Sequence, residues 1–338
     1  MIIVVGAGPA GLAAAKSAAS KGCHVTVIDS QARGGGQYWR HQTEVSGYKS
    51  NRSADYLNEL QQNKLITHIT GAQVWSAEKL GDGYQLNYLQ GGVEKKISAQ
   101  KIILTTGAYD RTLPFPGWTT SGVMTPGGAQ SLLKGHGIVA GKTIVVSGTG
   151  PFLLPVATAL ATNGARVEII EAQSPLRWAL SPLALLLNPG KFPELIHYAS
   201  AILRLKIKVS FGSAVTGYND GEVDISKVRS NLSIRKKNVR SAPADVVATG
   251  WGFLPDVTLG GILGCAQTLD RDETVIFAVD REQRANVQNI WIAGEATGIG
   301  GADLALVEGA IAGLSAAGSK ISVALIWKRF TKRLFARA

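Results

Sequence analysis

Short apolar runs that end in small residues recur along the chain. The N-terminal run MIIVV leads directly into glycine, and KIILTTG (101–107), TIVVSG (143–148), DVVATG (245–250) and NIWIAG (289–294) repeat the arrangement. Apolar runs of this length bounded by glycine predict buried strands of parallel sheets. Glycine turns and alanine-rich or leucine-rich segments predict helices after several of them. The pattern therefore indicates an α/β fold with two Rossmann-like nucleotide-binding domains.

Residues 1–30 predict a strand, a glycine turn, a helix and a second strand that ends in an acid. Gly6 allows the tight turn, Gly8 lets the backbone approach a pyrophosphate, and Gly11 lets the helix pack closely on the sheet. Asp29 ends the second strand, where a carboxylate accepts hydrogen bonds from a ribose diol. This order of elements predicts a dinucleotide site.

The segment that follows Asp29 favours FAD over NAD at this site. NAD-binding Rossmann domains usually continue directly into another helix, whereas ARGGGQYWR (32–40) is a glycine-rich loop of the kind that lies along a flavin ribityl chain. Near the C-terminus, Glu295 is expected beside the ribityl and pyrophosphate oxygens. The helix that begins near Gly301 and Ala302 would direct its amide dipoles at the flavin pyrimidine.

A second turn, GTGPFLLP (148–155), resembles the first but carries Leu153 where the first has its third glycine. Gly148 and Gly150 keep the tight turn and the close backbone approach. The helix that follows is expected to begin at Pro151. Glu171 ends the next strand, where a carboxylate suits a free 2′-hydroxyl and repels a 2′-phosphate. The turn predicts a site for NAD(H) or another adenine nucleotide such as ATP, with a vacant structural remnant as the alternative; NADP is excluded.

These motifs predict that one domain is inserted into another. The expected parts are a discontinuous FAD-binding domain (1–112 and 266–318), an inserted second nucleotide-binding domain (113–265) and a basic amphipathic C-terminal helix (319–338). The proline-rich and glycine-rich crossover 114–130 suits a stiff hinge. Residues 173–205 interrupt the second domain, and LALLL within them is too short to span a membrane, so we expect a packed helix there.

The C-terminal segment combines an apolar stripe with basic residues. The stripe is formed by Val323, Ile326, Trp327, Phe330 and Leu334. No acid accompanies the lysines and arginines, so the helix could lie on anionic lipid. We favour docking on the parent fold or on a partner subunit over membrane contact.

Composition narrows the function classes. The 338 residues carry a formal charge of +11, yet no nucleic-acid-binding motif accompanies it. The two cysteines lie far apart without a CxxC pair, and the five histidines show no metal-ligand spacing. The N-terminus begins as a strand, so no signal peptide is expected and the cytoplasm is the default location.

Three segments carry a family resemblance: TTGAYDRTLPFPGWTTSGVMTPGGAQSLL (105–133), GTGPFLLPVA (148–157) and GEATGIGGADLALVEGAIAG (294–313). Together they resemble the α subunits of heteromeric flavin dehydrogenases, namely opine oxidase, hydrogen cyanide synthase, D-hydroxyproline dehydrogenase and dye-linked L-proline dehydrogenase. Thioredoxin-reductase-like two-dinucleotide flavoproteins are similar more loosely. Many relatives continue into a cysteine-rich iron–sulfur domain that this sequence does not contain.

The resemblance implies FAD in this chain and a flavoprotein partner of the amino-acid-oxidase type. Any iron–sulfur centre is expected on a further small subunit or is missing. The candidate FAD positions are Gly6, Ala7, Gly8, Pro9, Ala10, Gly11, Asp29, Ser30, Gly35, Gly36, Gln37, Val74, Thr106, Gly107, Gly294, Glu295, Gly301 and Ala302. The candidate second-nucleotide positions are Gly148, Thr149, Gly150 and Glu171.

The expected function is that of an FAD-containing electron-transfer subunit whose partner oxidises a secondary amine or amino acid such as proline, hydroxyproline or an opine. No residue stands out as a general base or nucleophile, so the flavin carries the chemistry. One alternative is a self-sufficient NAD(P)H-dependent flavin oxidoreductase that passes electrons to a quinone, ferredoxin or dye. The other is a nucleotide-holding scaffold within a complex.

Overall fold

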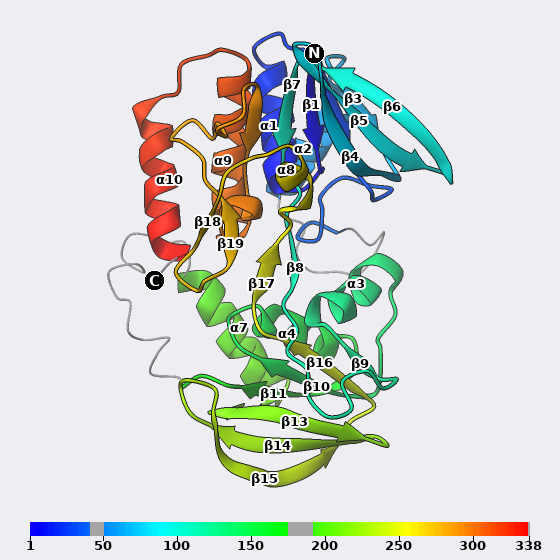
Figure 1. Ribbon diagram of the computed structural model, residues 1–338. Helices are drawn as coiled ribbons and strands as arrows, with labels where there is room; N and C mark the ends of the chain where they lie inside the picture. Colours follow the sequence, from blue (N-terminus) through cyan, green and yellow to red (C-terminus); the bar gives the residue numbers. More distant parts are fainter. Residues whose placement is uncertain (41–50, 175–191, 337–338) are drawn as a thin grey trace. The chain divides into compact units, whose positions relative to one another are not determined.

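The computed structural model describes residues 1–40, 51–174 and 192–336, which divide into two compact units (Figure 1). The first unit contains residues 1–40, 51–109 and 254–336, and the second contains residues 110–174 and 192–253. The chain leaves the first unit at β8 (Ala108–Asp110) and returns at β17 (Phe253–Pro255). The expected helix at LALLL lies outside the described residues.

A five-stranded parallel sheet in the order β20-β7-β1-β2-β3 organises the first unit. Its strands are β1 (Ile2–Val5), β2 (Val25–Ile28), β3 (Ile66–Ile69), β7 (Lys101–Leu104) and β20 (Ile290–Ile292). Side chains alternate between its faces: Ile2 and Val4 join one core cluster, whereas Ile3 and Val5 join another. Both faces are covered, which explains the uninterrupted apolar runs.

Helix α1 (Pro9–Ala19) and helix α9 (Gly301–Ala316) pack against each other on the first of these faces. The contact is close because the facing positions are small. A Cβ on Gly309 would lie 2.0 Å from the carbonyl oxygen of Ala10, and one on Gly313 would lie 2.2 Å from that of Ala14. The alanines of α1 and the glycine pair of α9 therefore fix where these two helix N-termini stand.

An antiparallel sheet contributes to the core cluster on the opposite face, through residues such as Tyr84 and Leu86. It is formed by β4 (Ala72–Leu80), β5 (Gly83–Gln90) and β6 (Val93–Ala99). The remaining elements of the first unit are α2 (Asn51–Gln62), α8 (Thr258–Ile262), β18 (Gln267–Leu269), β19 (Val275–Phe277), the 3₁₀ turn η2 (Glu295–Thr297) and α10 (Val323–Ala336).

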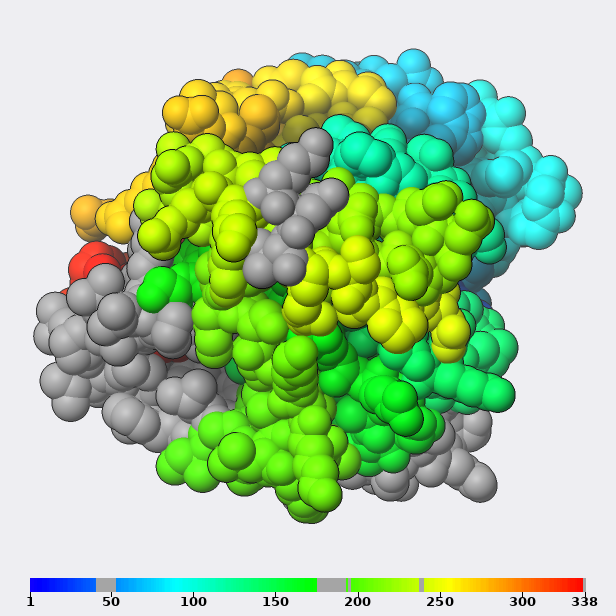
Figure 2. All heavy atoms as spheres, turned by 90° about the horizontal axis from the view of Figure 1, so that it is seen from below, coloured from blue at the N-terminus to red at the C-terminus, as the bar shows by residue number. Residues whose placement is uncertain are grey.

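The second unit repeats the plan with a parallel sheet in the order β12-β11-β10-β16-β9. Its strands are β9 (Val123–Met124), β10 (Thr143–Gly148), β11 (Arg166–Glu171), β12 (Lys208–Phe211) and β16 (Val246–Gly250), and its helices are α3 (Pro126–His136), α4 (Leu153–Thr162) and α7 (Phe192–Arg204). An antiparallel sheet of β13 (Ser213–Asn219), β14 (Glu222–Val228) and β15 (Ile234–Pro243) gives this unit the yellow-green surface of Figure 2.

The return to the first unit falls at 253/254, twelve residues before the expected boundary at 265/266. The reason lies in the core: Leu259 and Cys265 are buried in the same cluster as Ile3 and Leu104 of the first sheet. The outward crossing at 109/110 lies close to the expected 112/113.

Helix α10 lies alongside α9 (Figure 1), but it presents its basic side to the fold rather than its apolar stripe. Val323, Trp327 and Phe330 remain 83%, 63% and 56% exposed, and the Trp327 and Phe330 rings stack with centroids 5.5 Å apart. Across the described ranges, every helix is too short or too polar to cross a membrane.

Candidate functional site

The three glycines of the first turn have different surroundings. Gly6 has φ +100°, and a Cβ there would lie 2.4 Å from the carbonyl oxygen of Thr105. A Cβ on Gly11 would lie 1.9 Å from the carbonyl oxygen of Gly6. Gly8 has ordinary extended geometry, with φ −70°, and nothing lies within 4 Å of its Cβ direction. Gly6 and Gly11 are required by the fold, whereas the space at Gly8 is open.

The open space is bordered by unused hydrogen-bond donors. Among the described residues, the amides of Gly8, Ala10 and Gly11 have no acceptor, while the amide of Leu12 already donates to the Gly8 carbonyl. Pro9 begins α1 and lacks an N–H, which costs nothing at this position. Free amides at a helix N-terminus form an anion site. The turn therefore fits a pyrophosphate.

Asp29 lies at the carboxyl end of β2, beside this turn. It is 7% exposed, and its carboxylate accepts hydrogen bonds from the amides of Ala7 and Gln31. Ser30, the next residue, is exposed. The carboxylate retains acceptor capacity beyond these two amides, as a ribose diol requires.

The glycine-rich loop packs directly on the turn. The Gly35 amide donates to the Ala7 carbonyl at 2.8 Å, and a Cβ on Gly36 would lie 2.9 Å from the Cα of Gly8. Both glycines have positive φ, and Gln37 follows them in the loop. These glycines let the loop approach the turn without side chains between them.

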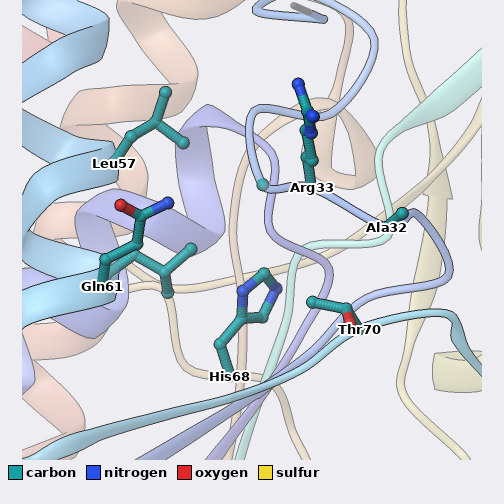
Figure 3. A pocket seen from close by; sticks show the side chains of 8 residues that line it. Ala32, Arg33, Leu57, Gln61, His68 and Thr70 are labelled. Carbon is teal, nitrogen blue, oxygen red and sulfur yellow. The ribbon is translucent and has the colours of Figure 1, made fainter.

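A pocket of about 490 Å³ opens at the end of β2 and β3 (Figure 3). It is lined by Ala32, Arg33, Gly34, Leu57, Leu60, Gln61, His68 and Thr70. The Nε2 atom of His68 is buried without a hydrogen-bond partner among the described residues. Burial lowers the pKa of His68, against a smaller opposing effect of the Asp29 charge. A neutral imidazole close to the Asp29 carboxylate is chemically compatible with the adenosine end of a dinucleotide.

His68 was not among the residues expected at the FAD site. Val74, one of the expected FAD positions, packs against the core cluster between the sheets and is not among the residues that line this pocket. His68 lies on β3, and its pairing with Val27 of β2 places it close to the level of Asp29, a neighbourhood that no sequence pattern shows.

The remaining candidate residues lie on the segments that follow β7 and β20. Thr106 donates to the Asp256 carbonyl at 2.7 Å, and Gly107 follows with φ +78°. Glu295 lies in η2 and accepts from the Gly301 amide at 3.3 Å, at the start of α9. Burial raises the pKa of the Glu295 carboxyl, and this hydrogen bond partly opposes the shift.

Gly294 and Ala302 complete this return. Gly294 has φ +79°, and a Cβ on it would lie 2.8 Å from the Cβ of Ala10. Ala302 occupies the first turn of α9. The structure thus brings η2 against the first nucleotide turn at Ala10.

The second turn offers fewer donors. The Thr149 amide donates to Gly250, the Gly150 amide to Glu171 at 3.2 Å, and the Leu153 amide to Gly150. Of the turn's described amides, only that of Phe152 has no acceptor. Helix α4 begins at Leu153 and not at the expected proline, so residues 151 and 152 form a turn instead.

Glu171 repeats the role of Asp29 in a more enclosed position. It is 2% exposed and also accepts from the Gln173 amide. Burial raises the pKa of its carboxyl, while hydrogen bonds from the Gln173 and Gly150 amides oppose the shift. Leu153 is buried in the core cluster of the second unit, and a Cβ on Gly148 would lie 1.6 Å from the Gly250 carbonyl.

The described histidine, cysteine, aspartate and glutamate side chains were compared with the requirements of metal and thiol sites. In the described ranges, no group of three His, Cys, Asp or Glu side chains could hold a metal ion. Cys23 and Cys265 are both free, and burial raises the pKa of the Cys265 thiol to about 11. A thiol of that pKa is a poor nucleophile at neutral pH.

The chain is similar in sequence to a known family and to several characterised proteins. Residues 1–313 match the sequence profile of the pyridine nucleotide-disulphide oxidoreductases. One of the subunits of the opine oxidase of Rhizobium meliloti is 32% identical over 342 residues, which cover 93% of this chain and 62% of that protein. Hydrogen cyanide synthase subunit HcnB of Pseudomonas protegens is 28% identical, over 93% of this chain and 69% of that protein. The chain spans less than two thirds of the length of the first of these relatives.

Solved structures share the fold. Thioredoxin reductase of T. acidophilum has a TM-score of 0.68 and 21% identity, with 94% of this chain and 97% of that chain covered. L-proline dehydrogenase of P. horikoshii has a TM-score of 0.65 and 18% identity, with 97% of this chain and 57% of that chain covered. These likenesses confirm the two-domain Rossmann-like architecture expected from the apolar runs.

Proposed function

Because the chain belongs to the pyridine nucleotide-disulphide oxidoreductase family, we propose that it is the FAD-containing electron-transfer subunit of a heteromeric dehydrogenase or oxidase that acts on a secondary amine or amino acid. The chain is an oxidoreductase, and its family implies binding of FAD and of NAD(P). The observation that carries the proposal is the first turn, with three free amides, an adjacent carboxylate and a pocket of about 490 Å³ in one unit.

The residues present fit FAD, and each would hold a different part of it. The amides of Gly8, Ala10 and Gly11 would bind the pyrophosphate, and Asp29 would bind the ribose. His68 would hydrogen-bond the adenine through its unpaired Nε2. When bound, FAD supplies reversible acceptance of two electrons.

Glu295 and the N-terminus of α9 complete the FAD site at its flavin end. Glu295 would contact the ribityl chain, and the α9 N-terminus would stabilise negative charge near the pyrimidine. The first-turn amide of Gly301 is already engaged by Glu295. The N-terminus of α9 would therefore act on the flavin end through its helix dipole and not through the Gly301 amide.

A partner subunit is part of the proposal. The relatives are named as subunits of opine oxidase, hydrogen cyanide synthase and sarcosine oxidase. By analogy, a flavoprotein of the amino-acid-oxidase type would perform the C–N oxidation. The exposed stripe of Val323, Trp327 and Phe330 supports a protein partner, because large exposed aromatic side chains mark interaction surfaces.

A second candidate function is supported by the second unit. We infer that its glycine turn binds an adenine nucleotide, NAD(H) in preference to NADP(H), more weakly than the first turn binds FAD. Glu171 would repel a 2′-phosphate, and the single free amide at Phe152 limits phosphate binding. A chain that binds both nucleotides could act alone as an NADH-dependent flavin oxidoreductase.

Two experiments separate these functions. Calorimetry on the FAD-loaded protein with NADH, NADPH and ATP should give weak binding of NADH or ATP and none of NADPH. Tighter binding of NADPH than NADH would contradict the role of Glu171, and absence of all three would make the turn a remnant. Turnover of proline, sarcosine or an opine by this chain alone would refute the requirement for a partner.

A further inference from the structure

One buried carboxylate joins the turn that ends β20 to the C-terminal helix. The side chain of Glu308, on α9, is 0% exposed. Its Oε2 accepts from the Gly294 amide at 3.2 Å and from the Thr297 hydroxyl at 2.9 Å. Its Oε1 accepts from Nε of Arg329 at 3.0 Å and lies 3.7 Å from the guanidinium of Arg333. The carboxylate therefore connects η2 with α10.

The two arginines also contact the same region directly. Arg333 donates to the carbonyl oxygen of Thr297, and also to its hydroxyl at 3.3 Å. With its amide oriented to satisfy both ends, the buried Gln283 donates to Ile292 of β20 and accepts from Arg329. Both arginine side chains are largely enclosed, 14% and 20% exposed. Strand β20, the η2 turn and α10 thus share one polar network.

This network attaches α10 to the first unit together with partly buried apolar side chains such as Ile326 and Leu334. None of the described residues of α10 is buried, and its large apolar side chains at Trp327 and Phe330 face solvent. The remaining ion pair, Lys332 with Asp303 at 3.4 Å, is partly exposed and contributes little. Arg329 and Arg333 are the residues that make the attachment specific.

The segment that the network holds is the one proposed to receive the flavin. Gly294 packs on Ala10 of the first nucleotide turn, while Thr297 is gripped by Glu308 and Arg333. Glu295 lies between Gly294 and Thr297 in the chain. Its position relative to α1 is therefore set by the close contact of Gly294 and by the charge network that holds Thr297.

We propose that Arg329 and Arg333 are positioning residues for FAD: they neutralise the buried Glu308 and thereby hold the Gly294–Thr297 turn in the shape that receives the flavin end of the cofactor. The proposal rests on the FAD site proposed above. The C-terminal helix α10 thus holds the flavin end of that site in position through these two arginines. By reciprocity, bound FAD also stabilises the docked position of α10.

The physical basis is the cost of an unpaired buried charge. Removing the cations leaves the Glu308 carboxylate in a dry site, which is strongly destabilising. The chain relieves this by opening the turn to water. That opening disturbs the hydrogen bonds to Gly294 and Thr297, and so displaces Glu295.

The test compares FAD with ADP, which contains only the adenosine and pyrophosphate part of the cofactor. The double variant R329M/R333M retains the side-chain stems but not the charges. We expect it to bind FAD about 10- to 100-fold more weakly, and ADP within about twofold of wild type. The matched control K328M removes an exposed cation of the same helix and should change neither affinity.

A second variant separates positioning from stability. E308Q/R329M/R333M no longer carries the buried charge, so its thermal unfolding temperature should recover. FAD binding should stay weak, because Arg333 no longer holds the Thr297 carbonyl. Hydrogen exchange of α10 amides should slow when FAD is added to the wild type. Wild-type FAD affinity in R329M/R333M, or an equal loss of FAD and ADP affinity, would overturn the inference. A wild type that binds ADP but no FAD would refute the proposed function and this inference with it.

Discussion

Replacing Gly8 with valine tests the first nucleotide turn most selectively. The position has φ −70° and ψ −178°, which any residue adopts, and nothing lies within 4 Å of its Cβ direction. The apo protein therefore accommodates the side chain. A bound pyrophosphate would not fit beside this side chain, because the valine occupies the space above the free amides of Gly8, Ala10 and Gly11.

The expected magnitudes differ for the two states. In the apo protein, the entropic gain of replacing glycine, about 0.4–1 kcal/mol, is offset by the poorer helix capping of valine, about 1 kcal/mol. In the holoprotein, phosphate hydrogen bonds worth roughly 1.5–3 kcal/mol each are lost. A loss of about 3 kcal/mol or more weakens FAD binding at least about 100-fold.

The assay is purification and flavin titration, with thermal unfolding of the apo protein. Gly8→Val should purify without yellow colour yet unfold near the wild-type temperature. Gly11→Ala provides the contrast, because its Cβ would lie 1.9 Å from the Gly6 carbonyl oxygen and should destabilise the apo protein itself. A fully flavinated Gly8→Val would refute the assignment of this turn.

Two further predictions concern the adenosine pocket and the C-terminal helix. His68→Phe should weaken FAD binding about 3- to 10-fold through the loss of one hydrogen bond, measured by flavin fluorescence. Burial lowers the pKa of His68, so the folded state favours the neutral ring, and stability should fall as pH drops below about 6.5 in wild type but less in His68→Phe. Liposome flotation should leave the protein unbound with neutral and anionic vesicles alike, because we assign the exposed stripe of α10 to a protein partner; salt-sensitive flotation with anionic vesicles alone would contradict this.

The elements of the fold followed from local patterns. Apolar runs that end in glycine predicted β1, β7, β10, β16 and β20 because these strands are buried on both faces, and such strands leave an unbroken signal. The glycines at 309 and 313 were not interpreted, because a role in close helix contact depends on the partner α1, which is distant in sequence.

The contents of the sites were harder to predict, because they depend on three-dimensional neighbours. His68 was missed since only the pairing of β3 with β2 places it beside Asp29. The amides of the second turn looked available in sequence, but Gly150 and Leu153 use theirs internally. The stripe of α10 was recognised, but its orientation was set by a buried acid on α9, which the periodicity of one helix does not reveal.

Anaerobic reduction of the bound flavin tests the central claim most directly. The FAD-loaded chain is mixed with NADH, with NADPH, or with an amine substrate together with the partner protein, and bleaching of the flavin absorbance is followed. An electron-transfer subunit predicts rapid bleaching only when the partner and the amine are both present. Rapid bleaching by NADH in the absence of a partner would contradict the account and make the chain a self-sufficient flavin oxidoreductase.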